Sequence, residues 1–150
     1  MQCTQASTSQ ITRDTGMISK DDKIDQVVLL LHDIDETRHL MERMLRGSNR
    51  VVLSARNEED ALLMARTYPP DVILMNLGMG AQAELSTARW ILEGTVSLAN
   101  TKIVLFCYPA VPEAAEVELE NHIYATRPDN FDQLRGFIER LRLEHYLSFC

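Results

Sequence analysis

The stretch Val27-Val-Leu-Leu-Leu-His-Asp33 decides the fold class of this chain. Its five consecutive apolar residues are too few for a helix and do not alternate with polar ones. This pattern is typical of a strand that is buried on both faces of a parallel sheet. Four further apolar runs follow, and we expect strands at 51–54, 72–75, 103–107 and 123–126.

Amphipathic stretches separate the apolar runs. Helices are expected from about residue 36, from 58 to before Pro69, at 84–93, at 112–121 and after Asn130. Five strands alternating with five helices predict a five-stranded parallel α/β sheet, doubly wound, with the flavodoxin-like strand order 2-1-3-4-5. Functional residues of such sheets lie beyond the carboxyl ends of the strands.

Length, charge and cysteine content limit the function. The chain has 150 residues, a net charge of −7 and a sequence pI near 5.0. We expect one domain at 25–145, a flexible polar tail at 1–24 and a short tail at 146–150. The acidic balance argues against nucleic acid and anionic membrane as partners. The sequence shows no membrane span and no signal peptide, and its three cysteines form no CxxC pair, so a cytoplasmic location is expected.

The predicted strands end in residues whose order and spacing match a known pattern. The interval is 43 residues from Asp33 to Asn76, 30 from there to Phe106 and 21 from there to Arg127. In order along the chain, the matching segments are Leu31-His-Asp33, Ile73-Leu-Met-Asn76, Val104-Leu-Phe106 and Tyr124-Ala-Thr-Arg-Pro128. Over residues 26–143 the sequence thereby resembles the receiver domain of bacterial response regulators.

The resemblance implies a phosphotransfer pocket, and the chain departs from it at four positions. In the family, the first strand ends in an acidic pair that binds Mg²⁺, the third in the phosphoacceptor aspartate and the fourth in Ser or Thr, and a lysine follows the fifth. Here Asn76 stands at the phosphoacceptor position, where its neutral carboxamide is a poor nucleophile. His32 leaves Asp33 alone in the acidic pair, although Mg²⁺ prefers carboxylate oxygens. Phe106 lacks the hydroxyl, and Arg127 replaces a compact ammonium by a planar guanidinium.

We therefore interpret the domain as a pseudo-receiver with no catalytic residue, no metal and no cofactor, in which Asn76 is a structural amide. Arg127 is expected in one interpretation to pair with Asp33, because a charge-assisted hydrogen bond would satisfy both groups. In another, His32 and Asp33 together bind a transition metal, although two ligands do not make a site. Tyr124 matches the family's switch aromatic, and we expect Phe106 to fill the space that its ring would enter.

The expected function is that of a phosphorylation-independent protein–protein interaction module in signalling. The family commonly dimerises or binds targets through its fourth helix, fifth strand and fifth helix, so the resemblance places the interface there. Glutamates of the predicted helix at 112–121 would face arginines of the last helix, which suits a signalling partner or a symmetric homodimer. The candidate interface residues are Glu113, Glu116, Glu120, Arg135, Arg140 and Arg142.

Two other functions stay open. A small-ligand-binding or enzymatic flavodoxin-like domain would need a phosphate-cradling loop, and the sequence has neither a G-x-G-x-x-G motif nor a P-loop. A receiver that is phosphorylated at a non-standard acid would use Asp33 or Asp71.

Overall fold

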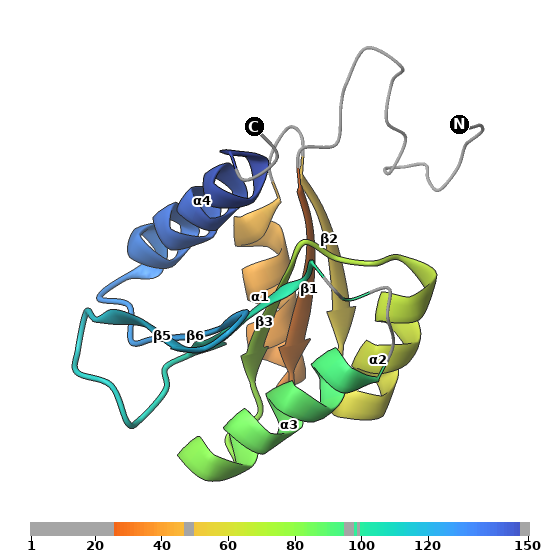
Figure 1. Ribbon diagram of the computed structural model, residues 1–150, viewed down its shortest axis with the longest axis horizontal. Coiled ribbons are helices and arrows are strands. Elements are labelled where there is room, and N and C mark those ends of the chain that lie inside the picture. Colours follow the sequence, from red (N-terminus) through yellow and green to blue (C-terminus); the bar gives the residue numbers. More distant parts are fainter. Residues whose placement is uncertain (1–25, 47–49, 95–97, 99, 148–150) are drawn as a thin grey trace.

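The structure is a computed structural model that describes residues 26–46, 50–94, 98 and 100–147, with side chains described as far as residue 141 (Figure 1). The predicted tail at 1–24 and the last residues of the predicted tail at 146–150 lie outside this part of the chain. Within the described residues, no helix combines the length and the apolar character that crossing a bilayer requires.

One mixed sheet forms the centre of the molecule, and its strand order is β2-β1-β3-β4-β6-β5. Five of its strands are parallel, and β5 is antiparallel to β6 at one edge. The parallel part confirms the predicted doubly wound fold, and β5 adds a sixth strand to it. The strands are β1 (Gln26–His32), β2 (Arg50–Ala55), β3 (Val72–Asn76), β4 (Lys102–Phe106), β5 (Glu116–Glu120) and β6 (Ile123–Thr126).

Helices cover both faces of the sheet (Figure 1). On one face α1 (Asp35–Leu45) and α4 (Phe131–Leu147) pack against alternate strand residues such as Leu30 and Leu74. On the other face α2 (Glu58–Thr67) and α3 (Ala81–Glu93) pack against the intervening residues, such as Leu29 and Ile73. Because side chains alternate between the faces of a strand, an unbroken apolar run supplies both cores.

The predicted caps of two helices are present. The Asn57 side chain accepts a hydrogen bond from the Asp60 amide at 2.8 Å and caps α2. Asn130 likewise accepts from the Gln133 amide at 2.9 Å before α4. Asn is a favoured cap because its side-chain oxygen satisfies a helix amide that has no partner within the helix.

The helix predicted at 112–121 is wrong, because this segment contains strand β5 instead. Its sequence Glu116-Val-Glu-Leu-Glu120 alternates polar and apolar residues with a period of two, which favours a strand. In a helix, Glu116 and Glu120 would repel each other four residues apart. The backbone around β5 is unusual: the non-glycine residues with positive φ in the described chain are Cys107, Ala114 and His122, with φ of 56°, 65° and 70°.

Candidate functional site

The ends of β1, β3 and β4 meet at the carboxyl edge of the sheet. His32 and Asn76 are neighbours in the register of β1 and β3. Phe106 ends the adjoining strand β4, and its ring centroid lies 5.9 Å from that of His32. Because β3 runs between β1 and β4, the two rings approach each other across the end of the strand that carries Asn76. The structure therefore brings these three predicted site residues together.

His32 is a buried, neutral side chain. Its Nδ1 accepts a hydrogen bond from the Ile34 amide at 3.1 Å, so a proton on the ring resides on Nε2. Burial lowers the pKa of His32; the nearby Asp33 carboxylate opposes this shift, and Arg38 adds to it. Although His32 Nδ1 lies 3.6 Å from the Asp33 carboxylate, the neutral ring makes no ion pair with it.

Asn76 shapes the loop that follows β3. Its side-chain oxygen accepts a hydrogen bond from the Gly78 amide at 3.1 Å, which is a local turn that Asn commonly forms. Gly78 has a φ of 67°, a conformation that a side chain would disfavour. The Asn76 side-chain oxygen thus has a hydrogen-bond partner within the loop.

Glu84 is a residue of this site that the sequence did not indicate. It lies in α3, its side chain is 6% exposed, and its carboxylate accepts hydrogen bonds from the Leu77 amide at 3.1 Å and the Met79 amide at 3.3 Å. Burial raises the pKa of Glu84, and these loop amides oppose the shift because they favour the charged form. A glutamate at the start of a helix is common, so only the fold of the loop reveals this role.

Arg38 is a second missed residue. It is buried, and its guanidinium donates to the His32 carbonyl at 2.9 Å and to the Asp35 carboxylate at 2.6 Å. These contacts join α1 to the end of β1. Asp33, whose side chain is 51% exposed, lies outside this network.

Arg127 does not pair with Asp33, as one interpretation of the sequence proposed. Its guanidinium donates to the Val111 carbonyl at 3.2 Å, in the segment between β4 and β5. That segment turns back beside β6 because Ala114 donates to the Arg127 carbonyl at 2.6 Å. The irregular chain that replaces the predicted helix thus provides Arg127 with a nearer acceptor than Asp33.

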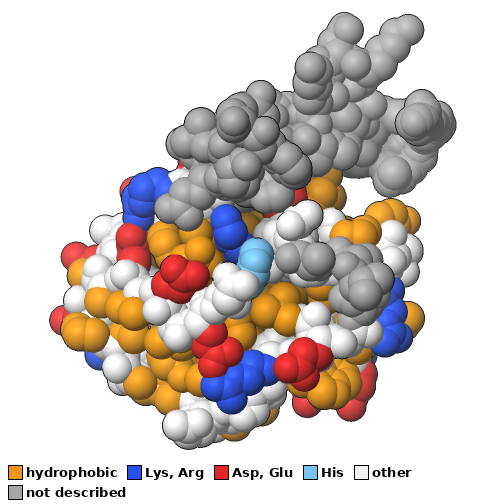
Figure 2. Space-filling model, in the orientation of Figure 1, with side chains coloured by type: hydrophobic (Ala, Val, Ile, Leu, Met, Phe, Trp, Pro, Cys, Tyr) orange, Lys and Arg blue, Asp and Glu red, His pale blue; other side chains and the backbone are white. Residues whose placement is uncertain are grey.

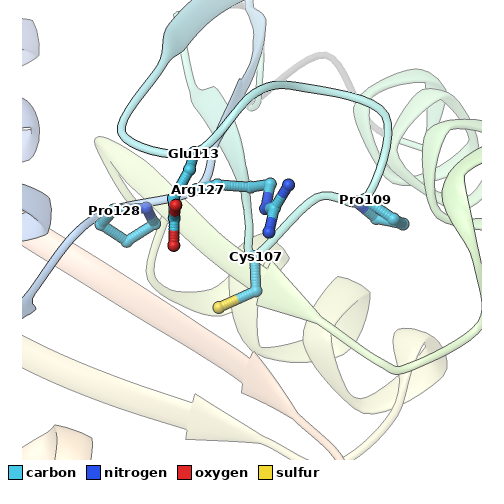
Figure 3. Close-up of a pocket in the computed structure, with 5 residues that line it drawn as sticks. All are labelled: Cys107, Pro109, Glu113, Arg127 and Pro128. Atoms are coloured by element: carbon cyan, nitrogen blue, oxygen red, sulfur yellow. The ribbon is translucent and has the colours of Figure 1, made fainter.

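An open pocket of about 480 Å³ lies where this segment passes the end of β6 (Figure 3). Cys107 is exposed at the pocket. The partial burial of its thiol group beneath the residue's exposed surface raises the pKa of Cys107, and Arg127 opposes this shift. The lining residues are Cys107, Pro109, Glu113, Arg127 and Pro128.

Tyr124 is half-buried on β6. Its ring packs edge-on against Phe137 of α4, with the centroids 5.9 Å apart and the planes at 76°. Phe106 is buried on the same face of the sheet. The proposal that Phe106 prevents Tyr124 from moving inward stays a prediction.

Four of the six candidate interface residues form ion pairs within the chain. Arg140 pairs with Glu116 and lies over the Phe137 ring, and Arg89 of α3 pairs with Glu120. Arg135 pairs with Asp132 and donates to the Met44 carbonyl at 3.3 Å. Glu113 lines the pocket, and the Arg142 side chain lies outside the described part of the chain. On the face shown in Figure 2, basic and acidic side chains are interspersed.

The carboxyl edge of the sheet carries a carboxamide at Asn76, a neutral imidazole at His32, an apolar ring at Phe106 and an exposed carboxylate at Asp33. In the described chain, no three His, Cys, Asp or Glu side chains are grouped closely enough to hold a metal ion. The fold and this edge define a doubly wound α/β domain.

Comparisons with known proteins specify the fold further. No protein-family model matches the sequence, and a search of curated proteins finds no match. The solved response regulator TrrA from Thermotoga maritima, in complex with Mg(2+)-BeF, is similar with a TM-score of 0.58 and 22% identity over 77% of this chain and 98% of that one.

Two further solved structures agree with this result. Chemotaxis protein CheY4 of Vibrio cholerae has a TM-score of 0.58 and 17% identity, over 77% of this chain and 98% of that one. The N-terminal domain of a response regulator/sensory box/GGDEF three-domain protein from Carboxydothermus hydrogenoformans has a TM-score of 0.59 and 19% identity, over 83% and 100%. The chain has the fold of response-regulator receiver domains, as its sequence predicts.

Proposed function

We propose that this chain is a receiver-fold module of two-component signalling that acts in the cytoplasm by binding another protein, without being phosphorylated. The observation that carries the proposal is Asn76 at the end of β3. Phosphorylation of a receiver requires a carboxylate oxygen that attacks phosphorus, and a neutral carboxamide does not form an acyl phosphate. The Asn76 oxygen also has a partner in the Gly78 amide.

The neighbours of Asn76 support the same proposal. Phe106 presents a ring where a hydroxyl would contact a phosphoryl oxygen, and this ring lies 5.9 Å from that of His32. His32 is neutral, so Mg²⁺ would meet Asp33 without a second carboxylate from β1 or β3. Arg127, which would have to contact the phosphoryl group, is hydrogen-bonded to the Val111 carbonyl.

The direct test is phosphorylation in solution. The full chain is incubated with acetyl phosphate and Mg²⁺ and analysed by intact-protein mass spectrometry, and an amide NMR spectrum is recorded with beryllofluoride and Mg²⁺. We expect neither a phosphoryl adduct nor spectral change around β3. An adduct on the wild-type chain would contradict the proposal.

Variants that reintroduce the family's residues show which substitutions prevent phosphorylation. Asn76→Asp alone should remain unphosphorylated, because Phe106 and His32 still lack the hydroxyl and the second carboxylate. Asn76→Asp combined with His32→Asp and Phe106→Thr should gain a Mg²⁺-dependent adduct. If Asn76→Asp alone sufficed, the surrounding substitutions would not be what prevents the chemistry.

Phosphorylation at another acid is the alternative, and the structure separates its two candidates. Asp71 precedes β3, and its carboxylate accepts a hydrogen bond from the Val27 amide at 2.7 Å, at the opposite edge of the sheet from Asn76. Asp33 is exposed at the carboxyl edge, directly after β1. An adduct that Asp33→Ala abolishes and Asp71→Ala leaves intact would favour this alternative.

The fold favours a protein partner. A second solved structure shows TrrA in complex with the histidine kinase ThkA, and its match to this chain has 20% identity and a TM-score of 0.58. In this chain the face formed by β5, β6 and α4 takes the place of the family's interface, with Glu116 and Arg140 exposed in part. Sedimentation of the full chain over a range of concentrations would show whether the same face forms a homodimer.

A further inference from the structure

The outer strand β5 leaves one side of its backbone unpaired in the described part of the chain. It is the last strand in the sheet and pairs with β6, with Val117 opposite Ala125 and Glu118 opposite Tyr124. An edge strand presents a row of backbone donors and acceptors to which another chain can pair. The edge of β5 is therefore the place where an extended segment could join this sheet.

The register shows which residues face outward. The Thr126 carbonyl accepts a hydrogen bond from the Tyr108 amide, which follows β4. The backbone groups of even-numbered residues in β6 therefore point toward β4. The Arg127 amide donates to the Ala115 carbonyl at 3.2 Å, so the backbone groups of Ala115 and Val117 face β6. The register shifts after Glu118, where Glu120 lies opposite Ile123. Since backbone groups alternate along a strand, Glu116 and Glu118 direct their N–H and C=O groups away from the sheet.

The two faces of this edge differ in chemistry. Glu116 contacts Arg140 and Gln133 of α4, and alternation places the exposed Glu118 on that same face. Glu118 makes no ion pair or hydrogen bond with another described side chain. Val117 points to the opposite face, where it is 38% exposed. A strand added here would therefore meet a free carboxylate on one face and an apolar side chain on the other.

A second copy of the chain does not fit this edge. In an antiparallel pair about a two-fold axis, the residues whose backbone groups face outward lie directly opposite each other. Because these residues are Glu116 and Glu118 in both copies, each such register places glutamate opposite glutamate. Like charges directly opposite each other destabilise a pair of strands. The glutamates thus oppose self-pairing and select a partner of opposite charge.

We infer that the edge of β5 binds an extended segment of a partner protein in which Lys or Arg alternates with apolar residues. The segment adds a seventh strand to the sheet through the backbone of Glu116 and Glu118. A basic side chain lies opposite Glu118, and an apolar side chain packs beside Val117. This inference rests on the proposed function, because it names the surface and the partner chemistry of a protein-binding module.

The test uses a labelled peptide, Ser-Lys-Val-Lys-Val-Lys-Ser, and the full chain. Binding is measured by fluorescence anisotropy, and amide NMR shifts should be largest at 116–120. Two further peptides carry N-methyl groups on the lysines or on the valines. Because only one of these sets of amides faces β5, one methylated peptide should lose binding and the other should retain it.

Protein variants test the same contacts from the other side. Glu118→Lys should weaken peptide binding about fivefold, because it replaces an attractive cross-strand pair by a repulsive one. The matched control is Glu59→Lys, which makes the same charge change at an exposed position of α2 and should leave affinity close to wild type. Glu118→Pro removes an outward N–H and should abolish binding, and a thermal melt of each variant checks folding.

Equal binding of the two methylated peptides would overturn the inference, because attraction to an acidic protein would then suffice. No binding of the unmethylated peptide would overturn it too, as would a homodimer that Glu118→Pro dissociates. None of these results involves phosphorylation, so the proposed function would stand or fall separately by the acetyl phosphate experiment.

Discussion

A glutamate near the carboxyl edge of the sheet and a glutamate on the outer strand β5 have different surroundings. Glu84 below the carboxyl edge is buried and contacts backbone amides of the β3–α3 loop. Glu120 on β5 keeps 33% of its side chain exposed and contacts the Arg89 guanidinium, with Nε at 3.0 and 2.9 Å from its two oxygens. Burial raises the pKa of Glu84, whereas the hydrogen bond from Arg89 lowers that of Glu120.

This difference indicates how each region is held. The β3–α3 loop depends on a buried carboxylate that accepts hydrogen bonds from its amides, so its shape is costly to change. The outer strand depends on surface ion pairs, which water and salt weaken and which a partner can rearrange. A carboxyl edge held by buried contacts and an outer strand held by surface ion pairs suit the proposed module, which would bind its partner through β5.

The largest expected effect is the loss of the Glu84 carboxylate. Glu84→Ala leaves the Leu77 and Met79 amides without their acceptor and should lower the free energy of unfolding by about 3 kcal/mol. Urea denaturation of the variant measures this loss. Glu84→Gln keeps one acceptor oxygen and should lose clearly less; equal losses would mean that packing, and not the hydrogen bonds, matters here.

Proline substitutions in β5 should differ according to which way each amide points. Val117→Pro removes a donor that faces β6 and should lower the free energy of unfolding by about 2 kcal/mol. Glu118→Pro removes a donor that faces outward and should change stability by about 0.5 kcal/mol or less. Thermal and urea unfolding compare the two variants, and a larger loss for Glu118→Pro would show that the register assigns the outward groups to the wrong residues.

The pH dependence of stability should differ in sign between the two glutamates. Because the folded pKa of Glu84 lies above its unfolded value, its protonation favours the folded state. The stability of wild type relative to Glu84→Gln should therefore rise as the pH falls through the folded pKa, and level off below the unfolded value of about 4.3. Urea titrations between neutral pH and this value check the slope, and a fall in relative stability would contradict the assigned shift.

Glu120 should give the smallest effect, with the opposite sign. Its folded pKa lies below the unfolded value, so its contribution is present above about pH 4.3 and is lost as the pH falls through the folded pKa. The difference in stability between wild type and Glu120→Gln should shrink on acidification. Added salt should reduce the same difference at neutral pH, and a difference that is insensitive to salt would show that the pair is not a surface ion pair.

The buried strands could be predicted from the sequence because their side chains face two cores. The apolar run that begins at Val27 belongs to β1, and the run predicted at 123–126 is β6. The error at 112–121 arose because Ala114 and Val117, and likewise Ala115 and Leu119, stand at helical spacing, although the alternation from Glu116 to Glu120 favours a strand. Short segments at a sheet edge have one covered face and few tertiary contacts, so the local sequence pattern predicts their secondary structure poorly.

At the candidate site, the residue types were visible and their partners were not. The sequence showed Asn76, His32 and Phe106 at strand ends, and the structure brings them together because parallel strands end at the same edge. It could not show that Arg127 contacts the Val111 carbonyl, because that contact depends on the path of the segment after β4. Glu84 was missed for the same reason, since its hydrogen-bond donors are loop amides that only the folded loop aligns.

The sequence by itself determined the doubly wound sheet and the identity of the residues at its carboxyl edge, because apolar periodicity and strand order follow directly from the chain. Only the tertiary structure decided which groups those residues contact and that β5 is the outermost strand among the described residues. Hydrogen-bond partners depend on which backbone atoms the fold brings within reach, and an edge exists only where no further strand arrives.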